Sequence, residues 1–215
     1  MRIGLNSVFL TIVSLFMTLS VATQAAEKFE EGKHYEVLSK PIPVTLEDGK
    51  DVAVWEIFGY GCPHCFNLEP ALERWKTTLN EGVQYQPVPA LFGRHWDVHG
   101  QAYVTAELMG VSDVTHAEFF NAIHIRKKRL NSIEAFADVA AEFGIDKDKF
   151  LKMSKSFAVN VKMNQAKTWV RSAGITSTPS MVVNGKYRIT GQTAGSNVRM
   201  LEVVNFLIEK EQAAK

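Results

Sequence analysis

An uncharged apolar run opens the chain and predicts a segment that is removed before the protein works. It covers residues 3–26, starts after Arg2 and ends in the small residues VATQAA. This pattern is typical of a secretory signal peptide over residues 1–26, cleaved near Ala25 or Ala26. The alternative is an uncleaved membrane anchor, but Ser and Thr side chains interrupt the run and no basic patch follows it. We therefore expect a mature protein that works outside the cytoplasm, where disulfides persist.

A buried strand and an amphipathic helix are predicted next. Residues 51–58, DVAVWEIF, are almost continuously apolar and rich in β-branched and aromatic side chains, which indicates a strand buried on both faces of a sheet. Gly59 and Gly61 bracket the turn that follows. Beyond this turn, apolar residues recur at alternating three- and four-residue steps and predict a helix. The series is Cys65, Leu68, Leu72, Trp75 and Leu79.

A second strand and a long helical block follow. VQYQPVPAL, residues 83–91, is typical of a short strand whose pairing ends at Pro87 and Pro89. Residues 96–172 carry no strand signal. Two pairs in this block have the spacing of capping boxes and are expected to open helices. They are Thr115 with Glu118 and Asn131 with Glu134.

The last part of the chain predicts a hairpin and a final helix. SMVVNGKYRIT, residues 180–190, places two β-rich arms around Asn184-Gly185, a strong signal for a tight hairpin turn. An amphipathic helix is expected over residues 196–212. Strands and helices that alternate around a helical block predict an α/β fold with an inserted all-helical domain.

Composition and charge narrow the class of protein. Hydrophobic residues make up 46% of the chain and charged residues 22%, as in an ordinary globular protein. Without the leader, which contains Arg2 and no acidic residue, 23 basic side chains balance 23 acidic ones. This balance excludes the basic surface of a nucleic-acid-binding protein. We expect the densest basic run, residues 126–129, to be a solvated helix face.

Both cysteines of the chain lie in GYGCPHCFNLEP, residues 59–70, at the predicted junction of strand and helix. Cys62 falls at the helix N-terminus, where free N–H groups and the helix dipole stabilise an anion such as a thiolate. Its pKa is expected to fall from about 8.5 into the range of about 3.5 to 7.5. Cys65 lies one turn later on the apolar face, so we expect it to be the buried partner. The pair therefore predicts redox chemistry.

Other uses of the two cysteines fit less well. A structural disulfide that closes so short a loop gains little, because the stabilisation grows with loop length. A zinc site would need two more ligands; His95 and His99 have helical spacing, but nothing in the sequence places them near the cysteines. Haem attachment would require a histidine where Phe66 stands.

Glu56 is unexpected at the centre of an apolar strand. Burial of an unpaired carboxylate is costly, and desolvation raises the pKa of such a group. If the strand is interior, Glu56 becomes a usable acid or base near neutral pH. The alternative is a bent strand on which Glu56 faces water.

Several motifs in the same order resemble the DsbA family of bacterial periplasmic dithiol oxidases. These are the strand that ends in Cys-Pro-His-Cys, the helical insertion, and Thr178-Pro179 before VVNGKY. The resemblance covers residues 27–215. It implies a thioredoxin fold in two parts, residues 27–91 and 167–215, with an all-helical domain inserted over residues 92–166.

The resemblance also implies roles for individual residues. Cys62 would be the exposed nucleophile and Cys65 its buried partner, with Pro63 and His64 between them and His64 stabilising the Cys62 thiolate. Pro179 matches the cis-proline of the family, so that the backbone of Thr178 would bind an extended substrate. Glu56 matches a buried acid that exchanges a proton with Cys65. Glu69 matches an acidic position of the family, where its charge would tune the site without acting as a catalyst.

Two departures from the family pattern stand out. The family often places a lysine near the buried acid on the strand after the active-site helix, and VQYQPVP has none. Thr178 before the proline is familiar from disulfide isomerases. An isomerase or reductase of the same fold is therefore one alternative, and a copper- or zinc-carrying dithiol protein is a second.

Taken together, the residues and the resemblance predict a monomeric periplasmic oxidoreductase that donates its Cys62–Cys65 disulfide to secreted proteins with free thiols. The resemblance implies reoxidation by a quinone-linked membrane protein similar to DsbB. We expect no bound cofactor, no metal and no nucleic-acid partner.

Overall fold

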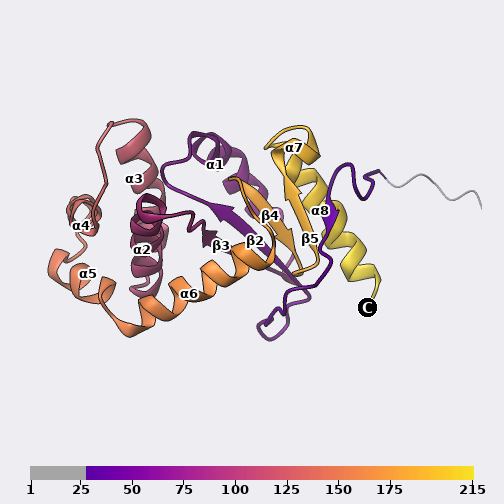
Figure 1. Ribbon diagram of the computed structural model, residues 1–215, viewed down its shortest axis with the longest axis horizontal. Helices are drawn as coiled ribbons and strands as arrows, with labels where there is room; N and C mark the ends of the chain where they lie inside the picture. The colour runs from indigo at the N-terminus through magenta and orange to yellow at the C-terminus, as the bar shows by residue number, and fades with distance from the viewer. Residues whose placement is uncertain (1–27) are drawn as a thin grey trace, which may run out of the picture.

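A five-stranded mixed sheet forms the centre of the computed structural model, which describes residues 28–215 (Figure 1). The predicted signal peptide over residues 1–26 lies outside the described residues. The strands follow the spatial order β1-β5-β4-β2-β3, and only the β2–β3 pair is parallel. They are β1 (Glu36–Val37), β2 (Val52–Phe58), β3 (Val83–Pro89), β4 (Ser180–Val183) and β5 (Tyr187–Thr190).

Helices cover both faces of the sheet, and further helices form a block beside it (Figure 1). Apolar residues of α1 and α8 share one core with β2, and the end of α6 packs on the opposite face. In the described part of the chain, no helix combines the length and the apolar character needed to cross a membrane. The helices are α1 (Pro63–Lys76), α2 (Arg94–Leu108), α3 (Ser112–His124), α4 (Ile133–Ala141), α5 (Lys147–Ser154), α6 (Phe157–Ser172), α7 (Gly191–Ala194) and α8 (Arg199–Ala213).

Strand β2 is interior, as its apolar run predicts. It lies between β3 and β4, and all seven of its residues are buried. Glu56 is fully buried with them, so the alternative of a bent strand with Glu56 in water is wrong. Strand β2 leads directly into the turn that contains the cysteines and then into α1.

The prediction that Pro87 and Pro89 end the pairing of the second strand is wrong for Pro87, whereas Pro89 is the last residue of β3. Strand β3 pairs with β2 through both prolines, with Pro87 opposite Glu56 and Pro89 opposite Phe58. The physical reason is that β3 lies at the edge of the sheet, where a residue without an N–H is tolerated on the unpaired side.

The hairpin is confirmed at the predicted place. Asn184 and Gly185 have φ values of 51° and 64°, the left-handed conformation that this kind of turn requires. The N–H of Lys186 donates to the carbonyl of Val183 and closes the turn at 2.9 Å.

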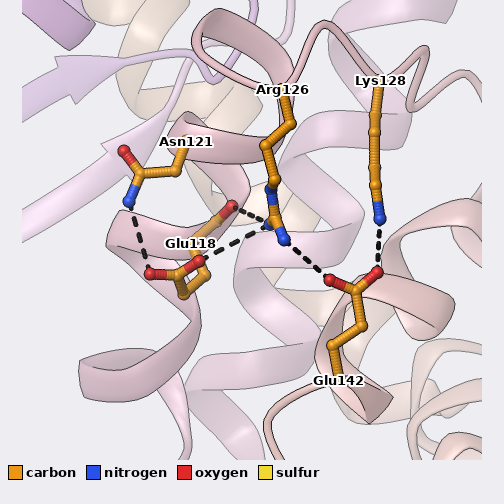
Figure 2. Close-up of polar contacts among 5 residues, drawn as sticks. All are labelled: Glu118, Asn121, Arg126, Lys128 and Glu142. Atoms are coloured by element: carbon orange, nitrogen blue, oxygen red, sulfur yellow. Dashed lines mark hydrogen bonds and ion pairs between the residues drawn. The ribbon is translucent and has the colours of Figure 1, made fainter.

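The block between β3 and β4 is helical, but two details of the prediction are wrong. Residues 126–129 are exposed to solvent, as expected, but they form the connection between α3 and α4 and not a helix face. Figure 2 shows the reason: Arg126 reaches Glu118 on α3 and Glu142 just after α4, and Lys128 also pairs with Glu142. These pairs hold the connection against both helices.

The capping positions are the second error. Thr115 lies within α3, and its hydroxyl donates to the carbonyl of Val111. Helix α4 is capped by Ser132, whose side chain accepts from the N–H of Ala135. The true cap is thus one residue after Asn131.

Candidate active site

The turn between β2 and α1 places both cysteines at the border of the sheet and the helical block. Cys62 is the N-cap residue of α1, and Pro63 is the first helical residue, where its missing N–H costs nothing. Both thiols belong to the core that also contains Phe58, Tyr60 and side chains of α2 to α6. The expectation that Cys62 is exposed is therefore wrong, because this packing leaves only 7% of the residue accessible. The cysteines are free, so the structure represents the reduced form of the pair.

Cys62 lies in surroundings that favour its thiolate. A hydrogen bond from the Cys65 thiol is the largest cause, and burial opposes it. Hydrogen bonds from Thr178 and from the N–H groups of Cys65 and His64 add to the stabilisation. Together they lower the pKa of Cys62 to about 5. The prediction of a lowered pKa from the position at the helix N-terminus agrees with this value.

Cys65 lies in the opposite electrostatic environment. It is completely buried, and desolvation raises its pKa far above the ordinary value for a thiol. The nearby Cys62 and the charge of Glu56 raise the pKa further. The pair therefore combines Cys62, whose thiol ionises readily, with Cys65, whose thiol keeps its proton, one helical turn apart.

Thr178 and Pro179 lie beside the cysteines although they are more than a hundred residues away in the chain. The Thr178–Pro179 peptide bond is cis, and the carbonyl oxygen of Thr178 is 3.4 Å from Sγ of Cys62. His64 is exposed, and its side chain makes no hydrogen bond or ion pair with any other described residue. The contact of His64 with the thiolate is through its backbone N–H.

Glu56 has a partner that the sequence analysis missed. The hydroxyl of Tyr85, on β3, donates to Oε2 of Glu56, and Oε1 has no hydrogen-bond partner. Desolvation raises the pKa of Glu56 to about 8, and the charge of Glu69 contributes in the same direction. Tyr85 thus contacts the acid on the strand where a lysine was expected. An aromatic residue with a polar tip in VQYQPVP was the available signal.

A cavity of about 780 Å³ lies next to this acid, between α1, β3, α2 and α3. The side chains that act on the pKa of Glu56 all line this cavity: Glu69, Tyr85, Lys76 and Glu73. His116 lines the same cavity from α3. Glu56 itself is fully buried and does not line the cavity, so its neighbours Tyr85 and Glu69 lie between it and this space.

Residues of the helical block hold the cysteine turn in place, and the sequence analysis did not find them. Trp96 packs against Gly59 so closely that a Cβ on Gly59 would lie 2.1 Å from its ring. Nε2 of His124 bonds to the carbonyl of Tyr60 at 2.7 Å, and the His124 ring stacks on Phe66. These contacts join positions far apart in the chain, for which sequence spacing carries no signal.

His95 and His99 also lie near the turn, contrary to the expectation that nothing connects them with the cysteines. A Cβ on Gly61 would lie 3.1 Å from the ring of His99 and 3.8 Å from that of His95. Burial lowers the pKa of His99 to about 4, which keeps it neutral. Within residues 28–215, no group of three or more His, Cys, Asp or Glu side chains could hold a metal ion.

In this mixed sheet the central strand β2 leads into a helix that begins with Cys-x-x-Cys, and a cis-proline lies beside the two cysteines. This arrangement defines a thioredoxin-fold thiol:disulfide oxidoreductase. Residues 76–200 match the family model of the DSBA-like thioredoxin domain. The chain is 42% identical to the thiol:disulfide interchange protein DsbA of Pseudomonas aeruginosa over 214 residues, 100% of this chain and 99% of that protein.

Solved structures agree with this match. The crystal structure of Pseudomonas aeruginosa DsbA superposes with a TM-score of 0.82 at 44% identity, over 88% of this chain and 97% of that one. The DsbA oxidoreductase of Xylella fastidiosa gives 0.79 at 30% identity, over 85% and 97% of the two chains. The chain belongs to the DsbA family of thiol:disulfide oxidoreductases. The predicted thioredoxin fold with a helical insertion and the predicted enzymatic activity are confirmed.

Proposed function

We propose that this oxidoreductase works as an oxidase, which donates its disulfide to proteins that fold in the periplasm. The observation that carries this proposal is the contrast between the two thiols, with the pKa of Cys62 lowered to about 5 and that of Cys65 strongly raised. A thiol of low pKa is a good leaving group in thiol–disulfide exchange. The disulfide should therefore be given up readily to a substrate.

The reaction proceeds in two exchanges. A substrate thiolate attacks Sγ of Cys62, which forms a mixed disulfide and releases Cys65 as a thiolate. Glu56, largely protonated at neutral pH, gives its proton to this thiolate. A second substrate thiolate then attacks the substrate sulfur of the mixed disulfide, which forms the substrate disulfide and releases the Cys62 thiolate.

The residues around the pair fit this sequence of steps. The carbonyl of Thr178, 3.4 Å from the Cys62 sulfur, offers a backbone acceptor to an extended substrate, and Pro179 fixes the course of that backbone. Pro63 starts α1 at the nucleophile. His64 supplies an N–H to the thiolate and an exposed imidazole next to the incoming substrate.

Cellular setting and domain division complete the proposal. Residues 1–26 are a cleaved signal peptide, the mature chain acts as a monomer in the periplasm, and a quinone-linked membrane protein similar to DsbB reoxidises it. The thioredoxin domain comprises residues 27–91 and 167–215, and the helical domain residues 92–166. Helix α6 is continuous across the second boundary and joins the two.

Trapping and redox equilibrium test the direction of transfer. Cys65→Ser should accumulate mixed disulfides with dithiol peptides, whereas the matched Cys62→Ser should form none. In glutathione buffers the wild-type protein should be mostly reduced at ratios that leave thioredoxin-like proteins oxidised. A reduction potential near that of thioredoxin, about −270 mV, would contradict the oxidase assignment and favour a reductase.

A further inference from the structure

His116 stands between two groups close to the active site. Its Nδ1 lies 3.0 Å from the hydroxyl of Tyr60, and its Nε2 lies 3.7 Å from Oε1 of Glu69. That carboxylate oxygen is buried and has no hydrogen-bond partner. The side chains of His116 and Glu69 are 17% and 14% exposed, so the pair is shielded but not closed off.

The ring of His116 is held in one orientation in either charge state. Phe58, Tyr103 and Phe120 contact it edge to face. The Tyr60 hydroxyl can donate to a bare Nδ1 or accept from a protonated one. Burial keeps the pKa of Tyr60 well above its ordinary value, so this hydroxyl stays neutral. Nε2 therefore faces Glu69 whether or not the ring is charged.

Few cationic side chains lie near the buried carboxyl groups of Glu56 and Glu69, so few could take the place of His116. Glu56 faces the cluster from β2, and other titratable groups line the cavity from each neighbouring element. They are Glu69, Glu73 and Lys76 of α1, Tyr85 of β3, Tyr103 of α2 and Asp113 of α3. Among these described groups, Lys76 is the one cation, and its attraction for the charge of Glu56 is weaker than the repulsion from Glu69.

We propose that His116 is a positioning residue that passes protons between water in the cavity and the carboxyl pair of Glu69 and Glu56. The inference rests on the proposed role of Glu56 as proton donor to Cys65. Histidine is suited to this exchange because each ring nitrogen can accept or donate a proton, and here one faces Tyr60 and the other faces Glu69. A small shift of the side chain, or one cavity water, bridges the 3.7 Å between Nε2 and Oε1.

The proton balance is as follows. Glu56 protonates the Cys65 thiolate and becomes a carboxylate. Imidazolium at His116 then gives its Nε2 proton to Glu69, which passes a proton on to Glu56. Water in the cavity returns a proton to Nε2, so the cycle consumes one solvent proton and no other reactant.

Oxidation of a dithiol peptide over many turnovers, with glutathione disulfide as the terminal oxidant, tests this route between pH 5 and 9, because a single turnover can use the proton that Glu56 already holds. His116→Gln should slow the reaction about tenfold at pH 6–7, less than loss of a direct general acid, because water in the cavity remains a poorer donor. The dependence of the turnover rate on pH should also change. Alkylation of the reduced protein, which reports the reactivity of the Cys62 thiolate and involves no proton transfer to Cys65, should keep the wild-type pH profile. His34→Gln makes the same change at a histidine that does not line the cavity and should stay within twofold of wild type.

Glu69→Gln removes the proton acceptor of the same route and is the second variant to test if His116→Gln folds poorly. It should slow the turnover similarly, and the double variant should be no slower than either single one. If both variants match His34→Gln in rate and pH profile while Glu56→Gln is slow, the inference about His116 is wrong and the role of Glu56 stands. If Glu56→Gln also behaves like wild type, the proposed role of Glu56 fails.

Discussion

A single buried carboxyl group, Glu56, links the fold to the chemistry at the scale of the residue. Its strand is surrounded by the sheet on both sides, so water cannot stabilise its charge, and its pKa rises to about 8. One hydrogen bond from Tyr85 partly compensates. The result is an acid that holds its proton at neutral pH beside a sulfur that needs one. This function costs stability, because a folded protein must keep the group neutral or bury a charge.

Glu56→Gln should therefore stabilise the protein while it impairs turnover. The pKa of Glu56 is about 8 when folded and about 4.5 when unfolded, so the wild type loses stability as pH rises from 4.5 to 8. The glutamine variant lacks this loss and should be more stable by about 1–3 kcal/mol at pH 7, and equal to wild type near pH 4. Urea unfolding across this pH range measures the difference.

Glu211→Gln is the matched control with the opposite sign. Burial disfavours the charge of Glu211, but hydrogen bonds from Lys186, Asn184 and Tyr187 lower its pKa overall. Its removal should destabilise the protein at pH 7, and the effect should fade as pH falls below about 4. If both variants changed stability in the same direction at pH 7, the electrostatic account of Glu56 would be incorrect.

At the scale of the element, local sequence patterns predicted individual strands and helices correctly, but they could not predict where a strand lies in the sheet. Strand β2, helix α1 and the hairpin followed from apolar runs, helical spacing and Asn184-Gly185. The pairing of β3 through its prolines depends on its edge position, which no local pattern shows. The same holds for β1, two residues long, which pairs with β5 across 150 residues of chain.

Gly185 makes the hairpin dependent on one glycine, so Gly185→Ala should destabilise the protein by about 2–4 kcal/mol. Its φ of 64° is unfavourable for alanine, and a Cβ would lie 2.1 Å from the backbone carbonyl of Ile42. Gly49→Ala is the matched control, because Gly49 has φ 79° but nothing within 4 Å of its Cβ position, and should lose only about 1 kcal/mol. Equal losses in urea unfolding would mean that the Ile42 segment moves away at no cost.

The site as a whole arises where two parts of the molecule meet, and this explains what the sequence could and could not predict. Cys62, Cys65 and Glu56 stand within ten residues of one another, so one local motif and one anomaly were enough to select them. Tyr85, His99 and His116 come from separate elements and reach the site only through the packing of α2, α3 and β3. Their types are common in any core, and their spacing to the cysteines has no period.

At the scale of the whole molecule, the charge on Cys62 should make the reduced protein more stable relative to the oxidised one as pH rises from 5 to 8. The pKa of Cys62 is about 5 when folded and about 9 when unfolded, so the stabilisation is complete above pH 9 and is lost as pH falls toward 5. Allowing for screening by solvent, it amounts to about 2 kcal/mol at pH 7. Only the reduced form has this thiolate, and a stabilised reduced form is the known source of oxidising power in DsbA proteins.

Thermal unfolding of both redox forms at several pH values measures this effect. The reduced form should melt higher at pH 7, and the gap should narrow by about 3–6 °C toward pH 5. Cys62→Ser provides the control, because it has no thiolate at this position. Its melting temperature should not show the rise with pH that the reduced wild-type protein shows relative to the oxidised one. A gap that stays constant from pH 5 to 8, or an oxidised form that melts higher at pH 7, would mean that Cys62 does not store the driving force for disulfide donation.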